Sequence, residues 1–164
     1  MKKMWMVRAG EGGKYWSRFM SESEVGINFS VGKDVNGLSR EEIESLYRRW
    51  RSSSRFTDRQ IRYKAGVLFR FCGEFARGDR VLTCNPRKRE YLVGRISERE
   101  CKYQKLSGQG IRESWHFYAV RWDGNPVSYD DVSESFRKGM KPRFTIFSVQ
   151  EKHQREILKK SGLA

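Results

Sequence analysis

The residues with the clearest capacity for chemistry are arginines, and they are concentrated between positions 48 and 70. This window holds eight Lys or Arg residues and a single acid, Asp58. A guanidinium group is planar and binds phosphate through two parallel hydrogen bonds, so an arginine-rich segment favours phosphate contacts. We predict that the residues of this segment that bind phosphate are Arg49, Arg59, Arg62 and Arg70. The alternative is a pair of basic helices that face only solvent.

The whole chain is strongly basic. Its 164 residues carry 34 Lys and Arg against 20 Asp and Glu, a formal net charge of +14. Such an excess attracts polyanions, which are nucleic acid, anionic lipid or an acidic protein. Lipid is the weakest of these, because no apolar run approaches the roughly 18 residues of a spanning helix and no signal peptide begins the chain. We therefore expect a cytoplasmic protein that binds nucleic acid and no membrane.

A second group of phosphate contacts is predicted near the N-terminus and at a hairpin tip. Arg8 and Gly10 begin a glycine-rich turn directly after an apolar run, and glycines allow a ligand to approach backbone amides. The turn does not match the Walker or the dinucleotide-binding pattern, so nucleotide hydrolysis is not predicted. The further cations expected to contact phosphate are Arg87, Lys88, Arg89 and Arg95.

Catalytic constellations are not recognisable. Paired acids with a neighbouring lysine, Ser-His-acid sets and metal-ligand spacings are all lacking in the sequence. Cys72, Cys84 and Cys101 are an odd number without a close pair in sequence, which indicates reduced thiols and neither a disulfide framework nor a zinc site. The prediction is a binding protein with no catalytic residues, metal or cofactor. A small nuclease whose dispersed acids converge in space is the enzyme alternative.

The periodicity of apolar residues predicts an α+β fold. Ser39 and Glu42 form a capping-box pattern ahead of a helix over 40–51. A second helix begins at Thr57 or Asp58 and carries an apolar stripe with helical spacing, with an arginine-rich face opposite that leaves room at Gly66 and Gly73. Further helices are expected at 13–23 and 150–160, and strands at 4–10, 25–30, 79–84, 91–96, 114–122 and 144–149.

These elements indicate one domain, 1–164, with a core at about 4–149. The expected architecture is a strongly bent sheet or barrel with two or three helices packed on it. No repeat, low-complexity tract or linker divides the chain. The segment 107–114 is expected to be a surface loop.

An ordered series of motifs then resembles a known family. The series runs from WMVRAGEGG at 5–13 and VGINF at 25–29 through LFRF at 68–71 to GDRVLTC at 78–84 and YLVGRI at 91–96. Together they resemble the PUA-like modules, related to EVE and YTH domains, that are joined to Mrr-type modification-dependent restriction endonucleases. The resemblance implies a bent β-barrel with flanking helices, a DNA-binding role in a restriction or phage-defence system, and a nuclease domain that is attached or a partner.

The resemblance also implies a pocket for a flipped, modified base, and modified cytosine is expected. A flipped base needs aromatic surfaces to stack on and polar groups for its edge. The residues assigned to this pocket are Trp16, Asn28, Phe29, Ser30 and Tyr103. The family often has Gly-Trp where this chain has Asn28-Phe29. Burial in the core is the alternative for each aromatic residue.

Duplex DNA is the favoured ligand, and three alternatives remain open from the sequence. An RNA-binding PUA-like protein would need the same basic face but would prefer unpaired bases and ribose hydroxyls. A small nuclease would need metal-dependent cleavage. A protein-interaction domain would use the basic face to meet an acidic partner, with a weaker salt dependence than several phosphate contacts produce.

Overall fold

The computed structural model describes residues 2–29, 31–50, 56–106, 113–141 and 143–164. The chain divides into two compact units. Unit 1 comprises Met1–Val25, Ala76–Arg99 and Tyr118–Ala164, and unit 2 comprises Gly26–Phe75 and Glu100–Phe117. Along the sequence, the two segments of unit 2 therefore alternate with the three segments of unit 1. Strands and helices are both present throughout, so the predicted α+β class, a mixed sheet with flanking helices, is confirmed.

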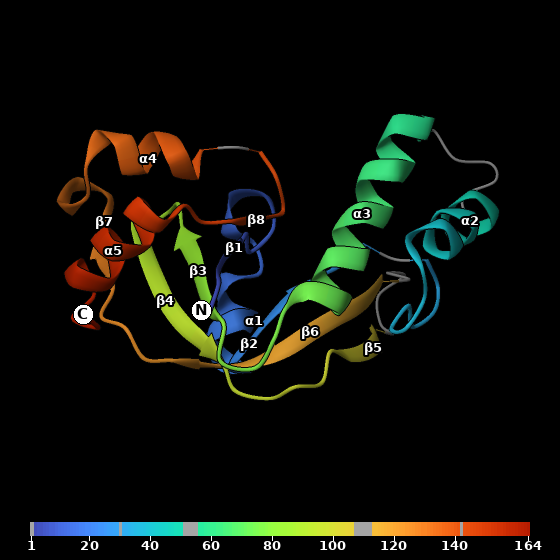
Figure 1. Ribbon diagram of the computed structural model, residues 1–164, viewed down its shortest axis with the longest axis horizontal. Helices are drawn as coiled ribbons and strands as arrows, with labels where there is room; N and C mark the ends of the chain where they lie inside the picture. The colour runs from blue at the N-terminus through green and yellow to red at the C-terminus, as the bar shows by residue number, and fades with distance from the viewer. Residues whose placement is uncertain (1, 30, 51–55, 107–112, 142) are drawn as a thin grey trace. The chain divides into compact units, whose positions relative to one another are not determined.

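Unit 1 is built on a mixed sheet (Figure 1). Its strands run in the hydrogen-bonded order β6-β4-β3-β1-β8, and β7 pairs with β4. β1 and β3 are parallel, whereas the other pairs in this unit are antiparallel. The strands are β1 (Met4–Val7), β3 (Arg80–Asn85), β4 (Glu90–Ile96), β6 (Glu113–Trp122), β7 (Val127–Ser128) and β8 (Ile146–Ser148).

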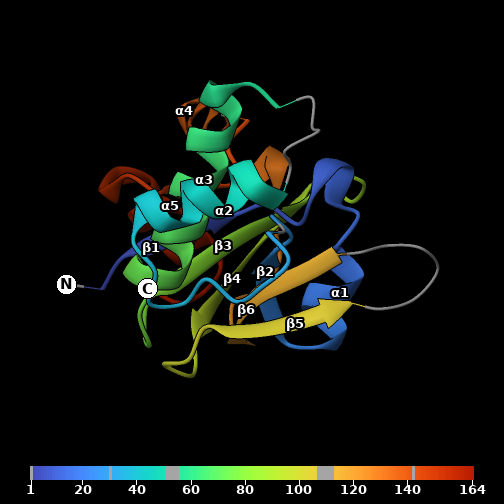
Figure 2. The ribbon, with the colours of Figure 1, turned by 90° about the vertical axis from the view of Figure 1, so that its right-hand side faces the viewer.

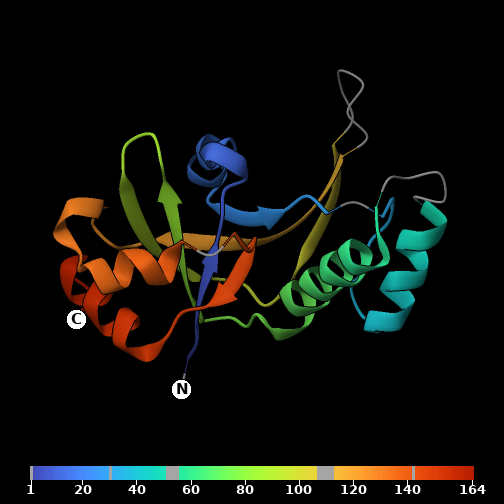
Figure 3. The same cartoon turned by 90° about the horizontal axis from the view of Figure 1, so that it is seen from above.

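The core of unit 1 lies between this sheet and two helices, α4 (Glu134–Met140) and α5 (Glu151–Lys160). Figures 1 and 3 show both helices on one side of β3 and β4. Alternate residues of the strands face this core, as the two-residue repeat of a strand requires. The sheet contributes Met4, Met6, Leu82, Tyr91 and Val93, and the helices contribute Phe136, Met140 and Ile157.

A buried carboxylate joins the start of β1 to the start of β3. Asp79 is only 3% exposed, and its oxygens accept hydrogen bonds from Trp5 Nε1 at 3.0 Å, the Lys3 N–H at 3.2 Å and the Ala76 N–H at 3.1 Å. Three donors satisfy a buried carboxylate that would otherwise be costly to desolvate. The Gly-Asp motif at 78–79 thus has a structural role in this chain.

Unit 2 contains two packed helices and a pair of strands (Figure 2). α2 (Arg40–Trp50) begins where Ser39 Oγ accepts from the Glu42 N–H at 3.1 Å. α3 (Asp58–Glu74) begins at a complete capping box between Thr57 and Gln60. Among its stripe residues, Ile61, Ala65, Leu68 and Phe75 are buried and Cys72 is half-buried, as the helical spacing predicted. Both predicted helices are confirmed, and residue 51 lies outside the described residues.

The strands of unit 2 are β5 (Lys102–Leu106) and the first half of β6, which are antiparallel with Tyr103 opposite His116. β2 (Glu24–Ile27) is hydrogen-bonded to β6 and contributes Gly26 and Ile27 to this unit. A Cβ on Gly26 would lie 2.7 Å from Trp115 Cε3 and 3.1 Å from the His116 oxygen. Only glycine fits this close approach of β2 to β6.

The structure differs from the sequence prediction in several elements. The N-terminal helix is shorter than predicted, because a 3-10 turn (Glu11–Gly13) precedes α1 (Trp16–Ser21). β2 ends at Ile27, so Asn28 and Phe29 lie after the strand and not within it. β5, β7 and α4 were not predicted, whereas the other four α-helices of the described residues correspond to predicted helices. Of the predicted loop at 107–114, residues 107–112 lie outside the described residues, and residues 113 and 114 belong to β6.

Candidate nucleic-acid interface

The glycine-rich turn and the hairpin tip, predicted separately as phosphate contacts, lie together in unit 1. The 3-10 turn Glu11–Gly13 packs beside β3, and a Cβ on Gly13 would lie 2.9 Å from the ring of Pro86 at the tip. Figure 3 shows the β3–β4 connection next to this N-terminal segment. At Gly10, which has a φ of +74°, the Tyr15 ring fills the space in front of the Cα. Packing against Tyr15 therefore explains glycine at position 10.

Arg8 has a structural contact inside unit 1. Its Nη2 donates a hydrogen bond of 3.1 Å to the carbonyl oxygen of Met140, the last residue of α4. A cation at a helix C-terminus satisfies an otherwise unpaired carbonyl and interacts favourably with the helix dipole. Arg8 thus fixes the end of α4, and a phosphate contact by Arg8 stays a prediction.

The hairpin tip presents exposed cations. Asn85 Oδ1 accepts from the Arg87 and Lys88 N–H groups at 3.1 and 3.3 Å, which orders the turn. Arg87 and Lys88 are exposed and do not enter the ion pairs of the described residues. Arg89 differs, because its guanidinium lies 3.4 Å from Asp130 and 5.2 Å from the centre of the Tyr129 ring. Arg87 and Lys88 are the tip residues most available to a ligand.

In unit 2, the predicted arginines of α2 and α3 fall into two groups. Arg49, Arg59 and Arg62 are exposed and take no part in the ion pairs found among the described residues. Arg70 pairs weakly with Glu74, one turn further along α3, at 3.8 Å. Arg48, which was not assigned to the site, donates a 2.5 Å hydrogen bond to Asp58. That bond and the Arg48 charge lower the pKa of Asp58.

The room expected at Gly66 is occupied. A Cβ on Gly66 would lie 2.9 Å from Nη2 of Arg40, whose guanidinium also donates to the Arg62 carbonyl at 3.3 Å. Gly66 is buried, so the expectation that it leaves an open approach on the basic face is wrong. The residue instead lets the Arg40 side chain lie flat across α3 and tie α2 to it. At Gly73, apart from the neighbouring residues and the backbone of α3 itself, no heavy atom of the described residues lies within 4 Å of the corresponding position.

The predicted base-pocket residues are divided between the units. Trp16 begins α1 in unit 1, whereas Asn28, Phe29 and Tyr103 belong to unit 2. Ser30 lies outside the described residues. Lys64 Nζ lies 4.3 Å from the centre of the Phe29 ring, so a cation covers this ring. The ring centres of Phe29 and Tyr63 are 6.4 Å apart. A base that stacks on this face of Phe29 has to displace Lys64.

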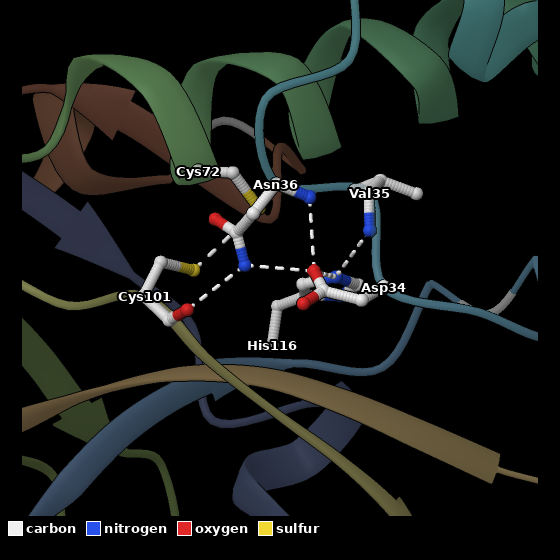
Figure 4. Close-up of polar contacts among 6 residues, drawn as sticks. All are labelled: Asp34, Val35, Asn36, Cys72, Cys101 and His116. Atoms are coloured by element: carbon white, nitrogen blue, oxygen red, sulfur yellow. Dashed lines mark hydrogen bonds and ion pairs between the residues drawn. The ribbon is translucent and has the colours of Figure 1, made fainter.

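Tyr103 contacts a buried histidine. The ring centres of Tyr103 and His116 are 4.9 Å apart, and the side chain of His116 is buried. His116 Nε2 accepts from the Val35 N–H at 3.2 Å and lies 3.4 Å from Asp34 Oδ1 (Figure 4). Burial lowers the pKa of His116, although Asp34 opposes this effect. Tyr103 Oη and His116 Nδ1 are buried, with no hydrogen-bond partner among the described residues.

The same part of unit 2 contains two thiols (Figure 4). Cys101 Sγ lies 3.5 Å from Cys72 Sγ, and the Cys101 carbonyl accepts from Asn36 Nδ2 at 2.8 Å. The sequence separation of 29 residues concealed this pair. In the described part of the chain, no three His, Cys, Asp or Glu side chains are grouped as metal ligands.

An open groove of about 710 Å³ runs along α2. Its lining has mixed charge, because Glu41 and Glu42 lie there with Lys33, Arg48 and Arg49. Among the described residues that line it, Arg49 is the one predicted site residue and none is aromatic. This groove is therefore distinct from the aromatic pocket expected from the sequence.

Arg95, the remaining predicted phosphate ligand, lies near the end of β4 in unit 1. It is directly opposite Arg80 on β3 and Arg121 on β6. Arg80 and Arg121 were not among the predicted phosphate ligands. The signal for Arg80 was available, because a turn at residues 86–89 sets the register of the hairpin. Arg121 pairs with β4 after a long connection, and its register could not be read from the sequence.

Comparisons with known proteins find little similarity. No family model matches the chain, and no curated protein matches it. A solved structure that aligns with it is the NMR structure of Rpa0253 from Rhodopseudomonas palustris, a structural genomics target. It is 12% identical, the alignment covers 98% of this chain and 94% of that one, and the TM-score is 0.41. In the described residues, no helix is both long enough and apolar enough to cross a membrane.

Proposed function

We propose that this protein binds nucleic acid, with duplex DNA as its ligand, through the arginines of α2 and α3. The observation that carries the proposal is the set Arg49, Arg59 and Arg62. These three guanidinium groups are exposed on two packed helices and are not engaged in the ion pairs of the described residues. The net charge of +14 adds a long-range attraction to the same kind of ligand.

Each phosphate that these arginines neutralise releases a condensed counterion, so affinity falls as salt rises. We expect the triple variant Arg49→Gln, Arg59→Gln, Arg62→Gln to bind a duplex on the order of tenfold or more weakly than wild type. Its slope of log K against log salt should be shallower by roughly 0.9 for each phosphate that the variant no longer neutralises. Fluorescence anisotropy at several salt concentrations measures both quantities.

A matched control separates direct phosphate binding from bulk charge. Lys141, Lys159 and Lys160 are exposed in unit 1, and changing all three to Gln removes the same total charge. The control variant should keep most of the affinity and slope of wild type. Equal losses of affinity in the two triple variants, or a wild-type slope near zero, would contradict an α2–α3 interface. A near-zero slope would favour an acidic protein as the partner.

The proposal includes selectivity for a modified base. Recognition of modified cytosine, a restriction or phage-defence role and an attached or partner nuclease domain are supported by the family resemblance in the sequence. In this proposal the chain is the binding module and not the enzyme. The test compares duplexes that differ only in cytosine modification. Equal affinity for all of them would remove the modified-base claim and leave DNA binding, and tighter binding of single-stranded RNA would replace DNA with RNA.

A further inference from the structure

Three arginines form a row across the sheet of unit 1. Arg80 on β3 is directly opposite Arg95 on β4, and Arg95 is directly opposite Arg121 on β6. Side chains of directly opposite residues project from the same face of a sheet, with Cβ atoms about 4.5–5.5 Å apart. This face is the one that carries Leu82 and Val93 into the core, because residues two apart share a face. The row therefore borders the core of unit 1.

Like charges in this arrangement oppose folding. Cross-strand pairs of equal charge are destabilising, and the row contains two such pairs in succession. The effect is visible at Arg80, whose pKa is lowered by burial and by the neighbouring Arg95 charge. One carboxylate offsets part of the charge, since Asp123 Oδ2 lies 3.4 Å from Arg121 Nη2. Three guanidinium groups thus share one ion-paired acid among the described residues of this part of the sheet.

The row also has unused hydrogen-bond donors. Arg80 Nη1 and Arg95 Nε are each buried as atoms and have no hydrogen-bond partner among the described residues, although both side chains are half-exposed. A buried donor without an acceptor lowers stability, so the arrangement favours an acceptor that carries negative charge. A phosphate group has both the charge and several acceptor oxygens.

We propose that Arg80, Arg95 and Arg121 form a phosphate-binding site in unit 1. The ligand is a phosphoryl group, either of a nucleic-acid backbone or of a free phosphate ester. Arg80 and Arg95 donate the hydrogen bonds that are unused in the structure, and the exposed side chain of Arg121 supplies additional charge. The site does not depend on the α2–α3 arginines of unit 2, so it stands whether or not these bind DNA.

The first experiment titrates the full chain with pyrophosphate and follows the arginine Nε–Hε signals by NMR. The signal of Arg95 should shift and saturate, and the Arg80→Gln variant should weaken this binding about tenfold. The control variant is Arg155→Gln on α5, whose arginine pairs with Glu151 on the surface and which should bind pyrophosphate like wild type. Absence of a saturable Arg95 shift, or equal weakening by both variants, would overturn the site.

A second measurement guards against a variant that is merely unfolded. Because Arg80 and Arg95 repel each other, Arg80→Gln should leave the midpoint of thermal unfolding unchanged or raised without ligand, while losing the increase that pyrophosphate gives the wild type. A lowered midpoint with the pyrophosphate response retained contradicts the proposal. A duplex that shifts the same Arg95 signal in competition with pyrophosphate identifies a nucleic-acid backbone as the source. A response to pyrophosphate alone identifies a free phosphate ester.

Discussion

Cys72 on α3 and Cys101 before β5 place their sulfur atoms 3.5 Å apart in unit 2. Hydrogen bonding by Cys101, together with burial, raises the pKa of Cys72, so Cys72 is held as a thiol. Nothing in the sequence indicates this relationship, because 29 residues separate the two cysteines. Only the packing of α3 against the segment that leads into β5 brings them together.

This proximity predicts a disulfide under oxidising conditions. With glutathione disulfide as oxidant, the two thiols lose two protons and two electrons, an S–S bond forms, and two molecules of glutathione are released. The bond should raise the free energy of unfolding by about 2–4 kcal/mol. Mass spectrometry after digestion should find Cys72 linked to Cys101. The Cys101→Ser variant should lose the bond, whereas Cys84→Ser should retain it. Links that involve Cys84 would contradict this geometry.

Asp79 is expected to be the most sensitive acidic residue of unit 1 to substitution. Replacement by Ala leaves the Trp5 Nε1 donor and the Lys3 and Ala76 N–H groups without their acceptor. We expect a loss of about 2–4 kcal/mol in the free energy of unfolding, measured by urea titration. Asp130, an exposed residue that pairs with Arg89, is the control. Its replacement by Ala should cost less than about 1 kcal/mol. Similar losses for both variants would argue against the buried network.

Because of His116, we expect the free energy of unfolding to depend on pH. Its pKa is lowered in the folded protein, mainly by burial. Below the ordinary value of 6.5 the unfolded chain therefore binds a proton that the folded chain does not. The contribution of His116 to the free energy of unfolding is therefore fully present above pH 6.5. This contribution is lost as the pH falls from 6.5 through the pKa that His116 has in the folded protein. His153 on α5 acts in the same direction, because burial lowers its pKa too. Chemical unfolding between pH 7.5 and about 5 measures the effect.

The matched variant for this test is His116→Gln. Glutamine keeps an acceptor for the Val35 N–H but does not titrate, so the fall in stability over this pH range should become smaller. His153→Gln should leave the His116 contribution in place. An unchanged pH profile in His116→Gln would show that His116 does not keep its lowered pKa in the folded protein.

Two glycines of unit 2 should respond in opposite ways to Ala. At Gly26 the new methyl group meets the Trp115 ring and the His116 carbonyl between paired strands, and neither can move without disturbing β6. We expect a loss of about 1–3 kcal/mol in the free energy of unfolding. At Gly66 the neighbour is the end of the Arg40 side chain, which can rotate away, and the helix gains from the replacement. Gly66→Ala should be neutral or stabilising, and thermal unfolding of both variants compares them directly.

Local signals allowed much of the fold to be predicted. The Thr57 capping box and the apolar stripe of α3 act within a few residues of each other, and so does the Asn85 turn that orders the hairpin. β5 escaped prediction because its polar residues lack strand alternation. α4 was missed because it is short, although Ser133 at its start is a recognisable cap whose Oγ accepts from the Phe136 N–H.

The candidate sites were less predictable, because they depend on contacts between distant segments. Phe29 looked like an open stacking surface, yet Lys64 from α3 lies over its ring. Arg8 looked like a phosphate ligand, yet it hydrogen-bonds to Met140, 132 residues away. The arginine row could be predicted only with the register of β6 against β4, which places Arg121 opposite Arg95. The position and the partners of a side chain therefore depend on contacts that residue types alone do not reveal.

The sequence order of unit 1 has a consequence for folding during synthesis. β1 pairs on one side with β3 and on the other with β8, so its second partner is made only when residues 146–148 emerge from the ribosome. Until then one edge of an apolar strand, MWMV, stays unpaired while unit 2 is already complete in sequence. Long-range pairing of this kind is slow, and an open apolar edge invites association with other chains. Nascent chains that lack β8 should therefore associate with other chains more readily than chains in which β1 is paired on both sides.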